Sequence, residues 1–97
     1  AEDFYPSSLN CGELITFAKA EHDKTLGLEG KLQMGMAIQY SRGYFDAWFI
    51  KGHTDAEAVL EASQMDELIL SLFKKCRDDD PDTSILTALE EVSKEQI

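Results

Sequence analysis

The two cysteines, Cys11 and Cys76, are the only thiols among 97 residues and the clearest candidates for chemistry. Each lies on the apolar stripe of an expected helix. The first stripe is Cys11, Leu14, Ile15 and Ala18, and the second is Met65, Leu68, Ile69, Leu72, Phe73 and Cys76. Both thiols should therefore face one core. They either form a disulfide, worth roughly 4 kcal/mol in the chain-entropy model, or stay reduced as small apolar groups. We favour the disulfide, and with it an oxidising compartment.

Other reactive groups are sparse. The two histidines, His22 and His53, are placed near expected helix ends, where surface roles are common. The chain has no glycine-rich phosphate loop, no HExxH and no Ser-His-Asp spacing. An acidic cluster resembles part of a calcium loop but lacks its central glycine and distal glutamate; its members are Asp78, Asp79, Asp80 and Asp82. We therefore expect no enzymatic activity, no cofactor and no metal.

Four helices are expected to position these groups, in an all-α fold with a flexible N-terminal arm over residues 1–9 and a single helical domain over 10–97. Asn10 can cap the first helix, which runs to about His22. The second covers residues 31–50, and its internal glycines, Gly35 and Gly43, indicate a close helix contact, a kink or a break.

The later helices start less clearly. The third is expected over residues 64–76, and Thr54 with Glu57 could form a capping box for a short helix before it. Asp80 suits the N-cap of the last helix, with Pro81 at its first position. No segment alternates apolar and polar residues convincingly.

The charge balance restricts the partners. Nineteen acidic and nine basic residues give a net charge of −10, which argues against nucleic acid and anionic membrane surfaces. Residues 55–97 carry −8 and residues 1–54 carry −2. In strong acid, nine basic residues and two charged histidines would leave +11. No apolar run approaches the roughly 18 residues of a membrane span, and an Ala-Glu-Asp opening suits a mature chain after signal cleavage.

An aromatic-rich stretch stands out in the second helix. Its rings are Tyr40, Tyr44, Phe45, Trp48 and Phe49. Core packing accounts for at least half of them, but one helix face in a small domain cannot easily hide all five. Some rings are therefore expected to be exposed, or to become so when packing loosens.

Three segments of the chain resemble the HdeA/HdeB family of small, helical, single-disulfide periplasmic proteins of Gram-negative bacteria. They are residues 10–14 (Asn-Cys-Gly-Glu-Leu), residues 43–45 (Gly-Tyr-Phe), and residues 76–81 (Cys-Arg-Asp-Asp-Asp-Pro) leading into 85–89 (Ile-Leu-Thr-Ala-Leu). The resemblance implies a Cys11–Cys76 disulfide and a removed export signal. It also implies a folded dimer near neutral pH that needs no nucleotide, and no catalytic residues.

This resemblance leads to a functional expectation: a periplasmic acid-stress chaperone that loosens at low pH and holds unfolding periplasmic proteins through apolar surface. The candidate client-binding residues are Tyr44, Phe45, Trp48, Phe49, Leu72 and Phe73. The alternative is a periplasmic interaction module, of the immunity or regulatory type, that binds at neutral pH through its acidic face. Salt should weaken the second kind of binding far more than the first.

Overall fold

The computed structural model describes residues 4–52 and 60–97 and confirms the all-α prediction. Its helices are α1 (Cys11–His22), α2 (Leu28–Lys51), α3 (Ala62–Asp78) and α4 (Ile85–Gln96), preceded by a short 3-10 turn, η1 (Pro6–Ser8). Within these described residues there is no strand, only an isolated antiparallel bridge between Asn10 and Ser84. The capping box predicted at Thr54 and Glu57 lies outside the described residues.

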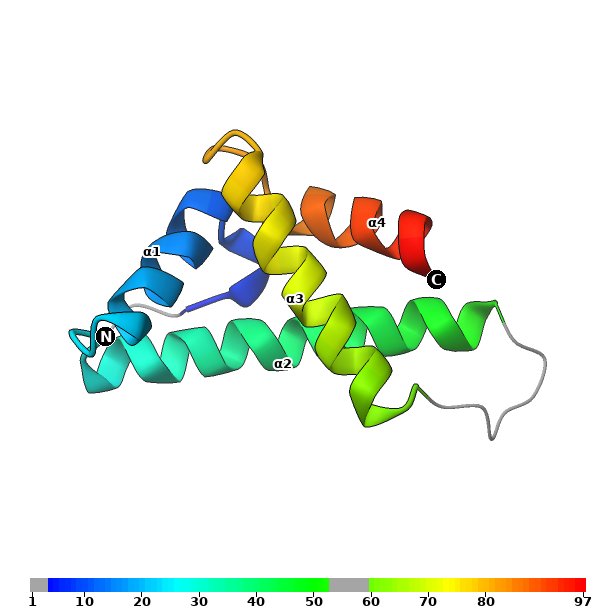
Figure 1. Cartoon of the computed structure of the whole chain (residues 1–97), viewed down its shortest axis with the longest axis horizontal. Coiled ribbons are helices and arrows are strands. Elements are labelled where there is room, and N and C mark those ends of the chain that lie inside the picture. Colours follow the sequence, from blue (N-terminus) through cyan, green and yellow to red (C-terminus); the bar gives the residue numbers. More distant parts are fainter. Residues whose placement is uncertain (1–3, 53–59) are drawn as a thin grey trace.

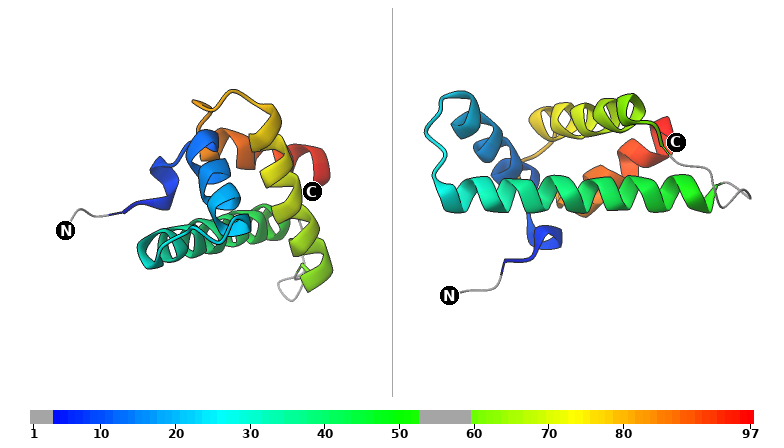
Figure 2. Two further views of the ribbon diagram at one scale, coloured as in Figure 1. Left: turned by 60° about the vertical axis from the view of Figure 1, so that its left-hand side comes forward. Right: turned by 90° about the horizontal axis from the view of Figure 1, so that it is seen from below.

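The long helix α2 runs the length of the molecule and forms its base (Figure 1). Helix α3 crosses over α2, and α1 packs beside α3 near the start of α2. Seen from below, α1 and α3 lie toward one side of α2 and η1 toward the other, while α4 crosses α2 so that its C-terminal end lies on the side of α3 (Figure 2). Both ends of the crossing helix α3 therefore have distinct neighbours, α1 at its C-terminal end and the later part of α2 at its start.

Local sequence signals explain the start of α1. The Asn10 side chain accepts a hydrogen bond from the Glu13 backbone N–H at 2.8 Å, and the Glu13 carboxylate accepts one from the Asn10 N–H at 3.2 Å. This is the predicted capping box. Helix α3 begins two residues earlier than predicted, at Ala62, where the Glu61 N–H donates to the Gln64 side chain at 3.0 Å.

The predicted start of the last helix is wrong. Asp80 and Pro81 form the first half of a turn, in which the Thr83 N–H donates to the Asp80 carbonyl at 2.9 Å. The Asp80 carboxylate accepts from the Asp82 N–H at 2.8 Å, so it stabilises this turn rather than a helix. Proline at the second position and aspartate at the first are typical of a type I turn. Ser84 is the N-cap, and its hydroxyl accepts from the Leu86 N–H at 3.2 Å.

The glycines within α2 do not have the predicted role. The helix is continuous, and a Cβ at Gly35 or Gly43 would meet nothing within 4 Å. Both positions face open space in the described structure. Their cost in helix propensity, about 1 kcal/mol each, is therefore not offset by a close contact in the single chain.

The segment predicted as a flexible arm packs on the helices in its described part. Leu9 is buried, Phe4 packs against the core, and η1 contacts both α2 and α4. The Leu9 carbonyl also accepts from the Ile85 N–H at 3.0 Å. Residues 4–9 therefore share the core of the helical domain.

One core joins all four helices, as the apolar stripes predicted. Its buried members are Leu9, Cys11, Leu14, Ala37, Phe45, Met65, Leu68, Leu72, Cys76, Ile85, Ala88, Leu89 and Val92. The buried positions of α3 repeat every three or four residues, which is the spacing of one helix face.

Candidate functional site

Cys11 and Cys76 form a disulfide, as predicted. Their Cα atoms are 4.6 Å apart, and the bond joins the first residue of α1 to the last turn of α3. Both residues are buried. A disulfide is compatible with an extracellular or periplasmic location.

Backbone hydrogen bonds reinforce this end of the molecule. The first N–H groups of a helix have no partner within it, but here the Cys11 N–H donates to the Thr83 carbonyl at 2.8 Å and the Gly12 N–H to the Pro81 carbonyl at 2.9 Å. Gly12 permits this approach, because a Cβ there would lie 2.9 Å from the Pro81 Cβ. We call residues 9–12 and 76–85 the disulfide junction.

The disulfide junction brings together two segments singled out from the sequence. Residues 10–14 open α1, and residues 76–81 end α3 and begin the turn before α4. The chain between the two cysteines spans 65 positions, yet the two segments share a covalent bond and the backbone hydrogen bond from Gly12 to Pro81. Their cysteine, glycine and proline residues thus have one common structural role.

The six candidate client-binding residues divide into two groups. Phe45 and Leu72 are fully buried, with 0% and 1% of their surface exposed. The other four are partly buried: Tyr44, Trp48, Phe49 and Phe73. In the folded state, only this second group can meet another molecule without rearrangement.

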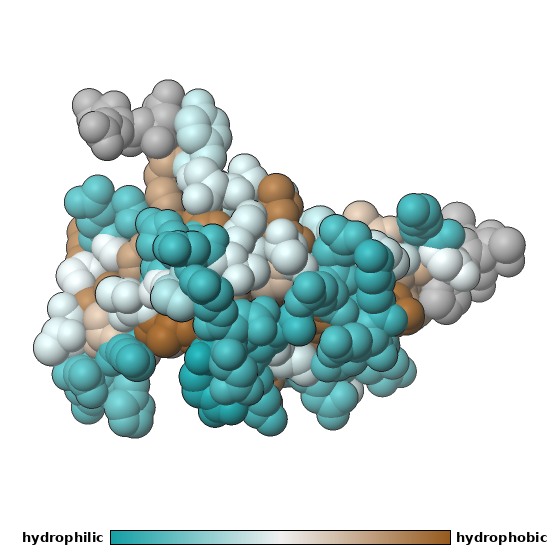
Figure 3. Space-filling view, turned by 90° about the horizontal axis from the view of Figure 1, so that it is seen from above, coloured by the Kyte–Doolittle hydropathy of each residue, from teal (hydrophilic) through white to brown (hydrophobic). Residues whose placement is uncertain are grey.

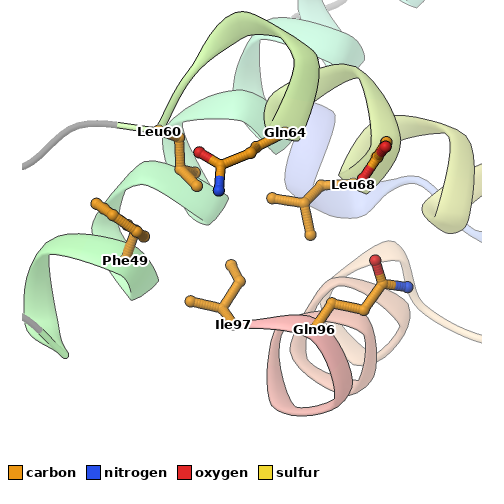
Figure 4. Close-up of a pocket in the computed structure, with 7 residues that line it drawn as sticks. Phe49, Leu60, Gln64, Leu68, Gln96 and Ile97 are labelled. Atoms are coloured by element: carbon orange, nitrogen blue, oxygen red, sulfur yellow. The ribbon is translucent and has the colours of Figure 1, made fainter.

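Two cavities border the aromatic end of α2. The first has a volume of about 260 Å³. Side chains point toward it from α2, from α3 and Leu60 before it, and from the C-terminus (Figure 4). It is lined by Phe49, Leu60, Gln64, Glu67, Leu68, Gln96 and Ile97. The second, about 380 Å³, is lined by Trp48, Lys51, Gly52 and Ile97. We call Trp48, Phe49, Leu60 and Ile97 the aromatic end.

Sequence reasoning identified the rings of the aromatic end but missed its other two members. Leu60 precedes α3 and Ile97 follows α4, so neither belongs to a periodic stripe within a helix. The Lys51 ammonium lies 5.7 Å from the centre of the Trp48 ring, a cation–π distance.

Few ion pairs cross between helices. In residues 4–52 and 60–97, the interhelical pairs are Lys75 with Glu91 at 2.9 Å and Lys75 with Glu95 at 4.0 Å, joining α3 to α4. The hydrogen bond that Lys75 donates to Glu91 raises the pKa of Lys75, and burial opposes this only in part. Each of the two remaining pairs lies within a single helix, Lys94–Glu90 in α4 and Arg77–Asp78 in α3.

Helix α4 also carries a buried polar group. The Ser93 hydroxyl is fully buried and has no hydrogen-bond partner among the described residues. An unsatisfied buried hydroxyl costs roughly 1–3 kcal/mol. The packing of α4 on the rest of the core is therefore weaker than its apolar face alone would give.

The remaining candidates for chemistry are the two histidines and the acidic side chains. His22 is exposed at the end of α1, and His53 lies outside the described residues. Across the described part of the chain, no three His, Cys, Asp or Glu residues gather in a way that could hold a metal ion. No helix of the described residues is long and apolar enough to cross a membrane.

Comparison of the chain with protein-family models, with curated proteins and with solved structures finds no match. Functional inference for this protein therefore depends on its own residues and their geometry.

Proposed function

We propose that this protein is a periplasmic holdase that is activated by acid. It would bind unfolding proteins and need no nucleotide. The observation that carries the proposal is the incomplete cover of the aromatic end. Trp48 and Phe49 are only partly buried in the folded structure and border two cavities. A modest loosening there would expose contiguous apolar surface, the kind of surface that binds other proteins.

Acid supplies the loosening. The net charge of −10 at neutral pH becomes +11 when every carboxylate is protonated and both histidines are charged. Repulsion of this size destabilises the compact state of a small domain. Protonation of Glu91 also removes the charged acceptor of Lys75, and with it the closest ion pair between α3 and α4.

The groups that face this ion pair favour the same outcome. Besides Glu91 and Glu95, Asp79 interacts favourably with Lys75 through its charge. On α4, Lys94 has Glu90 as its partner, and Tyr44 of α2 lies near enough to interact with it electrostatically. All of these carboxylates lose their charge in strong acid while both lysines keep theirs. The contact of α4 with α3 and α2 would then lose attraction and gain repulsion.

The disulfide junction limits the change. It ties α1 to α3 covalently, while α2 and α4 are held by packing and hydrogen bonds. Release of α4 would uncover its neighbours in the core, and Phe45 and Leu72 are the largest of the buried side chains on α2 and α3. These are the two candidate client-binding residues that are inaccessible in the folded protein.

The test is aggregation of an acid-sensitive client at about pH 2.5 and at pH 7, with Trp48 emission and far-UV circular dichroism recorded in parallel. Protection in acid, a Trp48 shift and retained helical signal are expected. If the protein stays tightly packed in acid and protects no client, the proposal fails. A salt-sensitive interaction module that acts at neutral pH then becomes the better account.

A matched pair of variants identifies the surface. Trp48→Lys places a charge in the aromatic end, and Leu28→Lys places the same charge on the opposite end of the same helix, where the leucine is 77% exposed. Trp48→Lys should reduce protection in acid and Leu28→Lys should not. Equal effects of the two variants would show that the aromatic end is not the binding surface.

A further inference from the structure

A groove between α1 and α3 combines an apolar floor with a basic rim. It has a volume of about 410 Å³, within the usual range for small-molecule sites, about 300–1,000 Å³. The floor is formed by Ile15, Ala18, Leu70 and Phe73, and the rim by Lys19, His22, Asp23, Lys74 and Arg77. Hydrophobic surface is visible among hydrophilic side chains on the face of the molecule that carries α1, α3 and α4 (Figure 3).

The rim is unusual for this chain. Three of its nine basic residues line the groove, against one acidic residue, Asp23, in a protein of net charge −10. Lys19 and Lys74 form no ion pair with any residue in 4–52 or 60–97. Arg77 is paired through Nε with its neighbour Asp78 at 3.1 Å, which leaves its terminal N–H groups for another acceptor.

We infer that this groove binds the monomer of a single-chain fatty carboxylate. The apolar tail lies along the floor, and the carboxylate meets Lys74, Lys19 and Arg77 at the rim. An anion without a tail would not suit the site, because the overall negative charge of the protein repels it. An apolar molecule without a head group would leave the rim unused. The combination of the two features selects an amphiphilic anion.

This site is independent of the proposed holdase function. The groove is present in the folded protein without any loosening, and it lies between the two helices that the disulfide joins. A ligand there would bridge α1 and α3 close to their covalent link. Only Phe73 is shared with the candidate client-binding residues.

The experiment is calorimetric titration of the intact protein with dodecanoate at pH 7.5, below its micelle concentration, with dodecanol and acetate as probes of tail and head group. One dodecanoate per chain is expected, with weaker binding of dodecanol and none of acetate. Absence of dodecanoate binding up to about 1 mM would overturn the inference.

Variants locate the site. Leu70→Glu places a carboxylate on the floor at a residue 55% exposed, and should weaken dodecanoate binding by roughly tenfold or more. Lys74→Gln combined with Arg77→Gln should weaken dodecanoate by a similar factor but leave dodecanol unchanged. Leu28→Glu is the matched control, an exposed leucine on α2, and should have no effect. Equal loss in Leu28→Glu and Leu70→Glu would overturn the assignment.

A second experiment distinguishes binding of a free fatty carboxylate from binding to a lipid surface. Vesicles with anionic head groups should not retain the protein, because its net charge of −10 opposes approach to them. Vesicle binding that depends on Leu70 and Lys74, without binding of monomeric dodecanoate, would replace the inference with a membrane-docking face. Thermal melts of each variant confirm that the fold is retained.

Discussion

The disulfide junction and the aromatic end are held together by different forces. At the junction, a covalent bond and two helix-terminal N–H groups fix α1 against the end of α3 and the turn that follows it. At the aromatic end, partly buried rings and the C-terminal Ile97 surround cavities. Covalent and backbone links do not depend on carboxylate charge, whereas the ion pair of Lys75 with Glu91, which joins α3 to α4, does.

This difference shows how one small domain can be both durable and responsive. On the proposed mechanism, a change in pH that weakens the aromatic end would leave the junction intact, and the loosened chain would keep two helices together. A domain of this size has a total stability of about 5–15 kcal/mol. A loss of a few kcal/mol at one end is therefore enough to change its surface.

The largest expected effect comes from breaking the junction. Replacing both cysteines by serine removes the cross-link over 65 positions, and the chain-entropy model gives a loss of about 4 kcal/mol. Urea melts at pH 7 under non-reducing conditions measure it. Acid treatment of this variant should also remove most of the helical signal, unlike the wild type. A loss below about 1 kcal/mol would mean that the junction does not depend on the disulfide.

Two glycine-to-alanine variants compare a crowded position with an open one. Gly12→Ala places a Cβ 2.9 Å from the Pro81 Cβ and 3.2 Å from its carbonyl oxygen, so we expect a loss of roughly 1–3 kcal/mol. Gly43→Ala meets nothing within 4 Å and should stabilise α2 by roughly 0.5–1 kcal/mol. Denaturant melts measure both changes. A change in the free energy of unfolding with the same sign in both variants would contradict the difference between the crowded and the open position.

The helices were predictable where periodicity and caps agree. Asn10 and Glu13 fixed the start of α1, and the stripe from Met65 to Cys76 predicted the buried face of α3. The start of α4 was mispredicted because Asp-Pro favours both a helix N-terminus and a type I turn. The local hydrogen bonds of Asp80 and the tertiary hydrogen bond from Gly12 to Pro81 both favour the turn, and the second is not visible in the sequence.

The candidate sites were predictable only in part. The cysteine pairing follows from two apolar stripes, but the groove between α1 and α3 depends on how those helices pack. A signal for its rim was present, since Lys19 and His22, and Lys74 and Arg77, are each three residues apart on one helix face. Sequence alone does not say that the two basic pairs meet across one apolar floor.

Ser93→Ala tests whether the packing of α4 controls the stability of the aromatic end. It removes a buried hydroxyl that has no partner among the described residues, and should stabilise the fold by roughly 1 kcal/mol. Because α4 is then held more firmly, the acid transition followed by Trp48 should move to lower pH. Ser63→Ala, at an exposed position on α3, is the control and should change neither the stability nor the pH of the acid transition. Destabilisation by Ser93→Ala would show that the hydroxyl is satisfied in solution.

The smallest effect concerns the ion pair between α3 and α4. The hydrogen bond that Lys75 donates to Glu91 raises the pKa of Lys75 above its ordinary value of 10.5. A raised lysine pKa means that the folded state holds the proton more tightly. On the alkaline side, the contribution of the pair to stability is therefore fully present up to about pH 10.5 and is lost as pH rises through the folded value.

Lys75→Gln should consequently lower the free energy of unfolding by about 0.5 kcal/mol near neutral pH, because Glu91 is half-exposed and the pair is partly screened by solvent. The difference between the wild type and Lys75→Gln should vanish once the pH has risen through the raised pKa of Lys75. It should vanish in strong acid too, where Glu91 is protonated. Lys74→Gln, one residue away on the exposed side of α3, is the control and should show no such pH dependence. A difference that stays constant from acid to alkali would mean that the ion pair does not hold α4 to α3, and that acid must loosen the aromatic end through overall charge repulsion alone.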